Sequence, residues 1–280
     1  MKLLRGITAI AALGVVASCT SEPAQSEANE YQAISGPRVV SLNPCLDAIL
    51  VELGAPDQVL ALSHYSRDPS SSSLPQSTAN QFAVTGGTAE EVMALRPDIV
   101  LASSFLSPAT QFALEKSGIS VETFGSPRSI EESVRQVRRI ATLLDRAEAG
   151  EALVSRMTQS ADPTELEPIS TLLWQPGQIV PGEATLIAEL LDGAGFISHS
   201  AQRGLDQADY VSLELILSDP PELLLIAGDS RGQNHPLLSA LDATRVETFD
   251  PSLLYCGGPT IHSVRERLNA IRDAIEADPA

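Results

Sequence analysis

The sequence predicts an α/β protein built of two Rossmann-like lobes with mostly parallel sheets, joined by one long helix. Short apolar runs alternate with helical patterns along most of the chain, and strands that alternate with helices pair in parallel through right-handed crossovers. A helical pattern fills residues 129–160, and a 13-residue pattern that precedes it returns after it. These observations favour two related lobes on either side of a linking helix.

The chain starts with the pattern of a bacterial lipoprotein signal. Two basic residues precede an apolar run that ends at Val16, and small residues then lead to Cys19. The run is too short to cross a bilayer. We therefore expect a signal peptide over 1–18, a lipid on Cys19, a flexible tether over 19–36 and a lipid-anchored location in the periplasm.

The first lobe is expected over residues 37–128. Apolar runs predict its strands, and helical spacing predicts the helices between them. The strands are expected at 38–42, 59–62, 97–102 and 119–124, and the helices at 47–53 and 109–116. A polar loop, 63–81, is rich in Ser and Pro and follows the second strand.

The linking helix over 129–160 begins with a capping pair, Ser129 and Glu132. Its apolar residues recur at helical spacing from Ile130 to Leu144. The second lobe is then expected over 161–280. Its strands are expected at 171–174, 223–227 and 245–249, and its helices at 184–191, 212–217 and 261–276.

The repeated pattern lies at an offset of 124 positions (214 − 90). Residues 88–100 match residues 212–224, and each copy opens with a hydroxyl residue that can cap a helix. Each copy then carries a Glu near the third helical position and ends in Pro before an acidic residue and an apolar strand. Glu90 and Glu214 therefore take corresponding positions in the two lobes.

The composition narrows the classes of function. Apolar residues make up 43% of the chain, and the formal net charge is −18, or −20 without the two basic residues of the signal (−18 − 2). This acidity makes nucleic acid an unsuitable partner. The zinc-protease pattern HExxH and the phosphate-binding pattern GxxxxGK do not occur. Cys45, His64 and Asp47 could act together as in a cysteine hydrolase, but no pattern in the sequence provides the oxyanion hole that such an enzyme needs. We expect a binding protein rather than an enzyme.

Two cysteines remain once Cys19 is assigned to lipid. Cys45 and Cys256 are 211 positions apart (256 − 45), in a compartment where disulfides persist. They form one long-range bridge, stay free, or ligate a soft metal together with His64 or His262. The sequence leaves these alternatives open, and the spacing contains no local metal-ligand motif.

Four segments, in order, resemble the class III periplasmic binding proteins, which serve ABC importers of vitamin B12, ferric siderophores and haem. They are RVVSLNPCLDAILVELGAPDQVLALSHYSRDP, GGTAEEVMALRPDIVLA, VPGEATLIAELLDGAG and VSLELILSDPPELLLIAGD. The resemblance covers nearly the whole chain after Arg38. It is strongest to the cobalamin binders, at residues 63–66 and around Glu90. It implies a ligand cleft between two lobes, with the linking helix as a stiff hinge.

The ligand of an open parallel sheet binds at the loops that follow its strands. With the resemblance, this rule predicts ligand contacts at Asn43, Pro44, Cys45, His64, Tyr65, Phe105, Trp174, Gln178, Gly182, Tyr255, Cys256 and Gly257. The expected ligand is cobalamin or another metal chelate, with no intrinsic cofactor and no metal site of the protein's own. Basic residues are too sparse in these loops to clamp an anionic siderophore. A ferric siderophore or haem is the alternative ligand.

Several of these residues have a second interpretation. Trp174 fills either the cleft or the core, and Tyr65 offers its ring to the ligand or lies on the surface. His64 either contacts a metal axially or is hydrogen-bonded or solvated. The segment 257–259 is either a ligand contact or a structural turn.

In the family, a glutamate on each lobe docks into basic pockets of the two permease subunits. The resemblance therefore implies that Glu90 and Glu214 meet an ABC permease dimer, which works with its ATPase. Capping of their own helices is the alternative. We expect a monomer, and a lipoprotein that senses its ligand without a permease is the remaining alternative.

Overall fold

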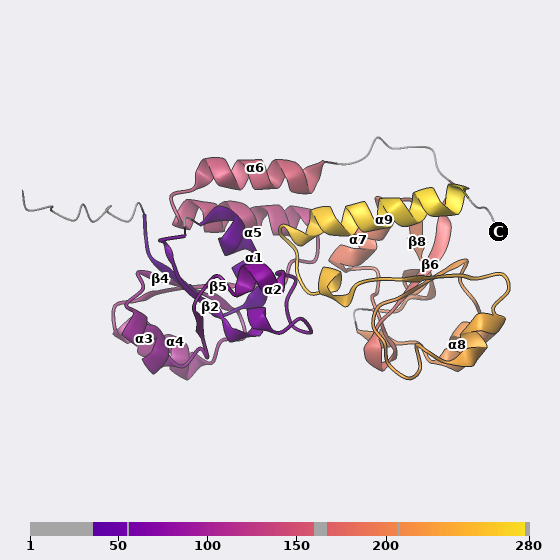
Figure 1. Cartoon of the computed structure of the whole chain (residues 1–280), viewed down its shortest axis with the longest axis horizontal. Coiled ribbons are helices and arrows are strands. Elements are labelled where there is room, and N and C mark those ends of the chain that lie inside the picture. The colour runs from indigo at the N-terminus through magenta and orange to yellow at the C-terminus, as the bar shows by residue number, and fades with distance from the viewer. Residues whose placement is uncertain (1–35, 55, 160–166, 207, 278–280) are drawn as a thin grey trace, which may run out of the picture. The chain divides into compact units, whose positions relative to one another are not determined.

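The computed structural model describes residues 36–54, 56–159, 167–206 and 208–277. These residues belong to one compact unit, 34–280, which contains two lobes (Figure 1). The expected signal peptide, Cys19 and nearly all of the expected tether lie outside the described residues. No helix in the described part is both long and apolar enough to span a bilayer.

The first lobe has a five-stranded parallel sheet in the order β3-β2-β1-β4-β5. Its strands are β1 (Val39–Ser41), β2 (Val59–Ser63), β3 (Val84–Thr85), β4 (Ile99–Ser103) and β5 (Ser120–Phe124). Its helices are α1 (Pro44–Leu53), the 3-10 helix η1 (His64–Arg67), α2 (Gln76–Ala79), α3 (Ala89–Leu95) and α4 (Pro108–Lys116). The four predicted strands and both predicted helices are confirmed, and β3, η1 and α2 are additional.

The second lobe has a four-stranded parallel sheet in the order β11-β10-β6-β8. Its strands are β6 (Ile169–Trp174), β8 (Phe196–Ser198), β10 (Leu223–Ile226) and β11 (Arg245–Thr248), and β7 (Ile179–Val180) pairs antiparallel with β9 (Asp209–Tyr210). Its helices are α7 (Leu186–Asp192), α8 (Leu213–Ser218) and α9 (Thr260–Ala277), with 3-10 turns η2 (Pro176–Gln178), η3 (Ala201–Arg203), η4 (Pro236–Ala240) and η5 (Pro251–Leu254). The predicted strands and helices are confirmed.

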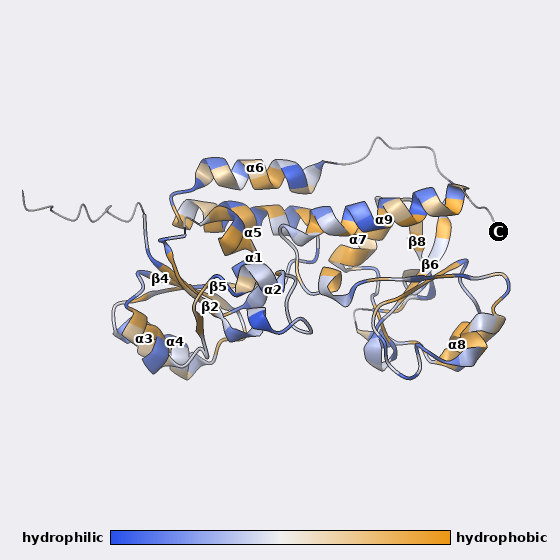
Figure 2. Ribbon diagram, in the orientation of Figure 1, coloured by the Kyte–Doolittle hydropathy of each residue, from blue (hydrophilic) through white to orange (hydrophobic). Residues whose placement is uncertain are grey.

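Alternation along the strands decides which helices cover each face of a sheet. In the first lobe Val39 packs with α1 and α5, whereas Val40 packs with α3 and α4. In the second lobe Leu173 packs with α7 and α9, whereas Leu172 packs with α8. The strands are mostly orange and lie between helices of mixed polarity (Figure 2). The largest apolar cluster includes side chains of both lobes.

The repeated sequence pattern corresponds to equivalent parts of the two sheets. The order β2-β1-β4-β5 in the first lobe matches β8-β6-β10-β11 in the second, with the same chain order in each. The two copies form α3 with β4 and α8 with β10, and Thr88 and Ser212 cap the two helices. The prediction of two related lobes is confirmed.

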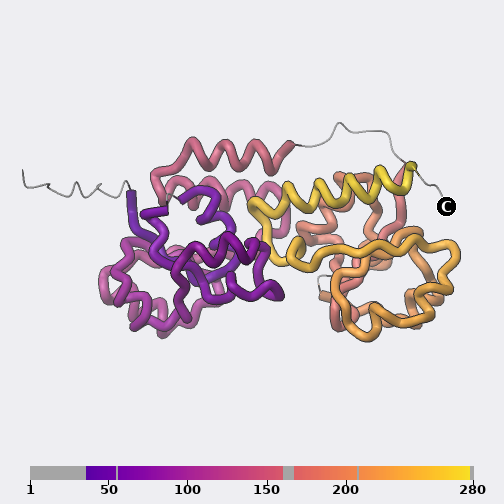
Figure 3. Tube along the Cα trace, in the orientation of Figure 1, coloured from indigo at the N-terminus to yellow at the C-terminus, as the bar shows by residue number. Residues whose placement is uncertain are grey.

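The predicted single helix over 129–160 is wrong. Two helices, α5 (Ile130–Leu143) and α6 (Ala147–Thr158), lie side by side in an antiparallel pair (Figure 3). Asp145 adopts a left-handed conformation, with φ of 56°, and Arg146 N–H donates to Ala141 O over 2.8 Å. This is the hydrogen bond of a Schellman motif, which ends a helix and usually has Gly where Asp145 stands.

Candidate functional site

A cavity of about 300 Å³ lies at the carboxyl ends of strands from both sheets. From the first lobe it takes Asn43 after β1, Ser103 at the end of β4, and residues 124–127 at and after β5. From the second lobe it takes Gln175 after β6 and residues 253–257 before α9. The cavity therefore occupies the cleft position that the topology predicts.

The residues that line this cavity are uncharged. Among the described residues in its wall, none is Asp, Glu, Lys, Arg or His. The polar side chains are amides and hydroxyls. They are Asn43, Gln136, Gln175, Ser103, Ser126, Thr185 and Tyr255. Such a wall recognises a ligand through neutral hydrogen bonds and apolar contact rather than through charge pairing.

A disulfide crosses this wall. Cys45 is bonded to Cys256, and their Cα atoms are 5.1 Å apart. This finding decides among the alternatives for the two cysteines, because sulfurs joined to each other are not thiolate ligands or nucleophiles. Within the described residues no group of three or more His, Cys, Asp or Glu side chains is arranged to hold a metal ion.

Five of the twelve predicted ligand residues line the cavity. They are Asn43, Cys45, Tyr255, Cys256 and Gly257. Asn43 also caps α1, because its side-chain oxygen accepts hydrogen bonds from the N–H groups of Cys45 and Leu46. Tyr255 is 39% exposed, and burial, with smaller contributions from Asp250 and Asp68, raises the pKa of its phenol. The phenol is therefore neutral at physiological pH.

Trp174 does not line the cavity, and its predicted place in the cleft is corrected. Its ring is 1% exposed, and its indole N–H donates to Val211 O over 2.9 Å. The reason is the alternation along β6, which turns Trp174 to the same face as Leu172, under α8.

The other six predicted residues also lie outside the cavity wall. Pro44 is the first residue of α1, Gln178 is exposed on η2, and Gly182 is packed against the backbone of Leu205 and Asp206. His64 and Tyr65 are the first two residues of η1, with ring centroids 4.0 Å apart, and Phe105 is 88% exposed after β4. The three rings lie at the carboxyl ends of β2 and β4, the same edge of the sheet that gives Asn43 and Ser103 to the cavity wall.

Sequence reasoning missed several cavity residues. Ser126 and Pro127 follow β5, so the rule already applied to the other strands would have found them. Gln136 reaches the cavity from the middle of α5, and no local pattern marks it.

The sequence also contains a GxSxG pattern, Gly228–Gly232, directly after β10. In hydrolases this pattern presents a nucleophilic Ser to a His. Here the hydroxyl of Ser230 donates to Gln233 Oε1 over 2.8 Å, and Gln233 in turn donates to Trp174 O and Ala227 O. The segment is a structural loop that closes over the end of β6.

Glu90 and Glu214 occupy the same position, the second residue, of α3 and α8. Both side chains are exposed. In the first lobe Glu91, not Glu90, makes the local contact, because Glu91 Oε2 accepts a hydrogen bond from Thr85 Oγ1. The hydrogen bonds from its own N–H and from Ser212 lower the pKa of Glu214, so this carboxylate is charged at neutral pH.

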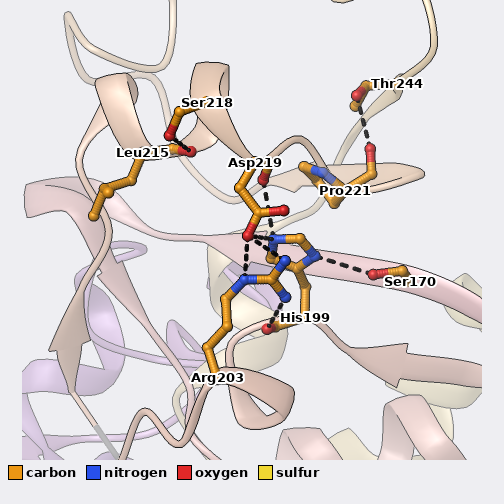
Figure 4. Close-up of polar contacts among 8 residues, drawn as sticks. All are labelled: Ser170, His199, Arg203, Leu215, Ser218, Asp219, Pro221 and Thr244. Carbon is orange, nitrogen blue, oxygen red and sulfur yellow. Dashed lines mark hydrogen bonds and ion pairs between the residues drawn. The ribbon is translucent and has the colours of Figure 1, made fainter.

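A polar cluster holds the far end of α8 (Figure 4). His199 is hydrogen-bonded to Ser170 Oγ over 3.0 Å and to Asp219 O over 3.1 Å. Arg203 forms an ion pair with Asp219 and donates to His199 O. Burial, and next the charge of Arg203, lower the pKa of His199. The neutral imidazole thus fixes the loop after α8 to β6, and Arg203 fixes the same loop to η3.

Comparison with known proteins identifies a family to which most of the chain matches. Residues 39–246 match the family model described as "Periplasmic binding protein". The cobalamin-binding protein of Halobacterium salinarum is 32% identical over 126 residues, which are 43% of this chain and 32% of that protein. The chain thus aligns with about a third of that relative's length.

Solved structures share the fold at lower identity. The periplasmic haem-binding protein HutB of Vibrio cholerae has a TM-score of 0.69 at 18% identity, over 85% of this chain and 99% of that one. A periplasmic haem-binding protein of Pseudomonas aeruginosa has a TM-score of 0.65 at 22% identity, over 84% and 92%. The periplasmic vitamin B12 binding protein BtuF of Vibrio cholerae has a TM-score of 0.63 at 18% identity, over 86% and 98%.

Proposed function

Because the chain belongs to the periplasmic binding protein family, we propose that it is the lipid-anchored solute-binding protein of an ABC importer and that it delivers cobalamin or a related uncharged chelate. The lipid is on Cys19, which tethers the protein beside its permease. Anchoring raises the effective concentration of the loaded protein near that partner.

The observation that carries the choice of ligand is the uncharged cavity wall. Haem has two propionates and many ferric siderophores are anionic, so a site for either gains from Arg or Lys. The cavity has amides and hydroxyls instead. Cobalamin presents amide side chains around its corrin ring, and these can both donate to and accept from Asn43, Gln136 and Gln175. The cobalamin-binding relative supports the same choice.

The cavity holds only part of such a ligand. Its volume of about 300 Å³ is at the small end of ligand pockets, and a corrin with its side chains is larger. The remainder extends to the rim, where Tyr65 is 50% exposed and Phe105 88% exposed. Aromatic rings at that position offer flat apolar contact to a macrocycle. A haem or ferric-siderophore ligand is the second candidate.

The partner in transport is a permease dimer with its ATPase. Glu90 and Glu214 are exposed, equivalent and one to a lobe, as two-point docking on a dimer requires. A lipoprotein that senses its ligand without a permease would not need this pairing.

Titration of the full-length protein in detergent with cyanocobalamin, haem and a ferric siderophore tests the ligand. We expect the cobalamin spectrum to shift with a Kd in the micromolar range or below, and at least tenfold weaker binding of the other two. Tighter binding of haem or siderophore would assign the site to that ligand, and binding of none would reject the transport function.

A charge placed in the wall should weaken the site. Gln175→Glu puts a carboxylate beside the ligand, and we expect cobalamin affinity to fall at least fivefold. Gln178→Glu is the matched control, because Gln178 is three residues away, exposed and outside the wall. Isothermal titration of the two variants gives the comparison, and equal losses would contradict the proposed site.

A further inference from the structure

Chain order divides the described elements between the two lobes. The elements from β1 to α6 belong to the first lobe and those from β6 to α9 to the second, so the main chain passes from the first to the second after α6. The disulfide between Cys45, in the first turn of α1, and Cys256, just before α9, is a second covalent connection. It lies in the cavity wall itself.

The segment that contains Cys256 is wedged into the first lobe. A Cβ added to Gly257 would lie 2.7 Å from Ser133 Oγ, and one added to Gly258 would lie 2.7 Å from Ile49 Cγ1. Gly258 N–H also donates to the buried Ser133 Oγ over 2.7 Å. Residues 256–258 therefore fit closely between α1 and α5, where a side chain at Gly257 or Gly258 would force its neighbours to shift.

The position of residues 253–257 in the cavity wall depends on how residues 256–258 are held between α1 and α5. These residues belong to the second lobe by chain order, yet both ends of the wall are held by the first lobe. At one end Ser73 Oγ donates to Ser252 O over 2.7 Å, and at the other end the disulfide fixes Cys256 next to the hydrogen bond from Gly258 N–H to Ser133 Oγ. A single hydrogen bond is easily broken by thermal motion, whereas the disulfide is not.

We propose, on the basis of the function proposed above, that the Cys45–Cys256 disulfide is the positioning element of the ligand site. It anchors the wall at 253–257 to α1, so the wall keeps its place while ligand enters and leaves at the rim. Loss of the bond frees the wall and speeds ligand release. The effect on entry is small, because the rim residues are unchanged.

Amide hydrogen exchange of the full-length protein tests the anchoring without any ligand. In the variant Cys45→Ser with Cys256→Ser, we expect amides of 253–257 to exchange at least tenfold faster, and those of β4 and β10 to stay within twofold of wild type. Treatment of the wild type with dithiothreitol should have the same effect, since the dithiol becomes a cyclic disulfide while Cys45 and Cys256 each gain a hydrogen. Reoxidation should reverse it.

A matched control separates anchoring from general loss of stability. Val92→Ala removes two methyl groups from the buried face under α3, away from the cavity. We expect this variant to leave the wall's exchange within twofold of wild type. Equal acceleration in both variants, or an unchanged wall in the serine variant, would overturn the proposed role.

Stopped-flow release of cyanocobalamin supplies the ligand readout. We expect at least fivefold faster dissociation from the serine variant, with association within twofold and with the Val92→Ala protein unchanged. Unchanged dissociation beside a loosened wall would reject the disulfide as the positioning element. A wild-type protein that binds no cobalamin would reject the proposed ligand instead, and the exchange experiment would still decide on the anchoring.

Discussion

At the scale of single residues, burial determines what Asp47 and Trp174 do. Asp47 is fully buried in α1, and its Oδ2 accepts hydrogen bonds from Ser63 N and Ser66 Oγ, while its Oδ1 has no partner among the described residues. It therefore ties the start of η1 to α1. The cost of burying its charge raises its pKa to about 7, and the hydrogen bonds offset this only in part.

Asp47→Asn should stabilise the protein in a pH-dependent way. The folded pKa of Asp47 lies above its unfolded value of 3.8, so the folded state holds the proton between pH 4 and 7 and stability falls as pH rises through that range. Asn does not ionise, so we expect equal stability of variant and wild type at pH 4 and an advantage of a few kcal/mol for the variant at pH 8. Urea unfolding at both pH values measures it. An advantage of the same size at pH 4 would contradict this explanation.

Trp174→Phe should lower stability without changing ligand binding. The substitution leaves Val211 O, the acceptor of the indole N–H, without its donor inside the core, which costs about 1–3 kcal/mol. Since the ring is not in the cavity wall, we expect cobalamin affinity within twofold of wild type. Denaturant unfolding measures the loss of stability, and isothermal titration measures the affinity. A large loss of affinity would show that Trp174 contacts the ligand.

At the scale of elements, the alternation of apolar runs predicted most strands and helices, because each buried strand leaves a local pattern. The break between α5 and α6 was not predictable in this way, since an Asp holds the left-handed position where Gly would have marked a stop. The short strands β3, β7 and β9 have two residues each, too few for a pattern. For the site, strand ends predicted Asn43 and Tyr255, whereas the side of the sheet taken by Trp174 depended on a register that the sequence did not specify.

The α5–α6 pair depends on one small residue. A Cβ added to Gly150 would lie 2.4 Å from the Cβ of Ala141 on the facing helix, so Gly150→Ala should force the helices apart. We expect a loss of about 1–3 kcal/mol, even though Ala favours helix by about 1 kcal/mol. The control is Gly193→Ala, which meets only ordinary contacts at 3.4 Å or more. Thermal unfolding compares the two, and a neutral Gly150→Ala would contradict the close crossing.

At the scale of the whole molecule, two lobes of the same strand order share one apolar cluster and are joined by the chain and the disulfide. The shared cluster joins α1 and α5 of the first lobe to α7 and α9 of the second. The lobes therefore meet through packed helices, and the two sheets present their carboxyl ends to one cavity.

Removal of the disulfide should reduce the stability of the whole fold. The bond closes a loop of 211 positions, and loop closure of this length removes unfolded-state entropy worth about 5 kcal/mol. We expect the melting temperature of the Cys45→Ser, Cys256→Ser variant to fall by about 10 °C or more, as measured by calorimetry. A melting temperature equal to that of the wild type would show that the bond acts only locally.

The disulfide also makes a covalent ring of most of the chain. A protease that cuts the backbone once between Cys45 and Cys256 opens the ring but produces no separate fragment. Both halves of the cavity wall then stay in one molecule until a second cut or a reductant separates them. A nicked protein should therefore migrate as a single species on a gel without reductant and as two on a gel with it. For a protein exposed to extracytoplasmic proteases, this connectivity means that one backbone cut does not separate the two lobes.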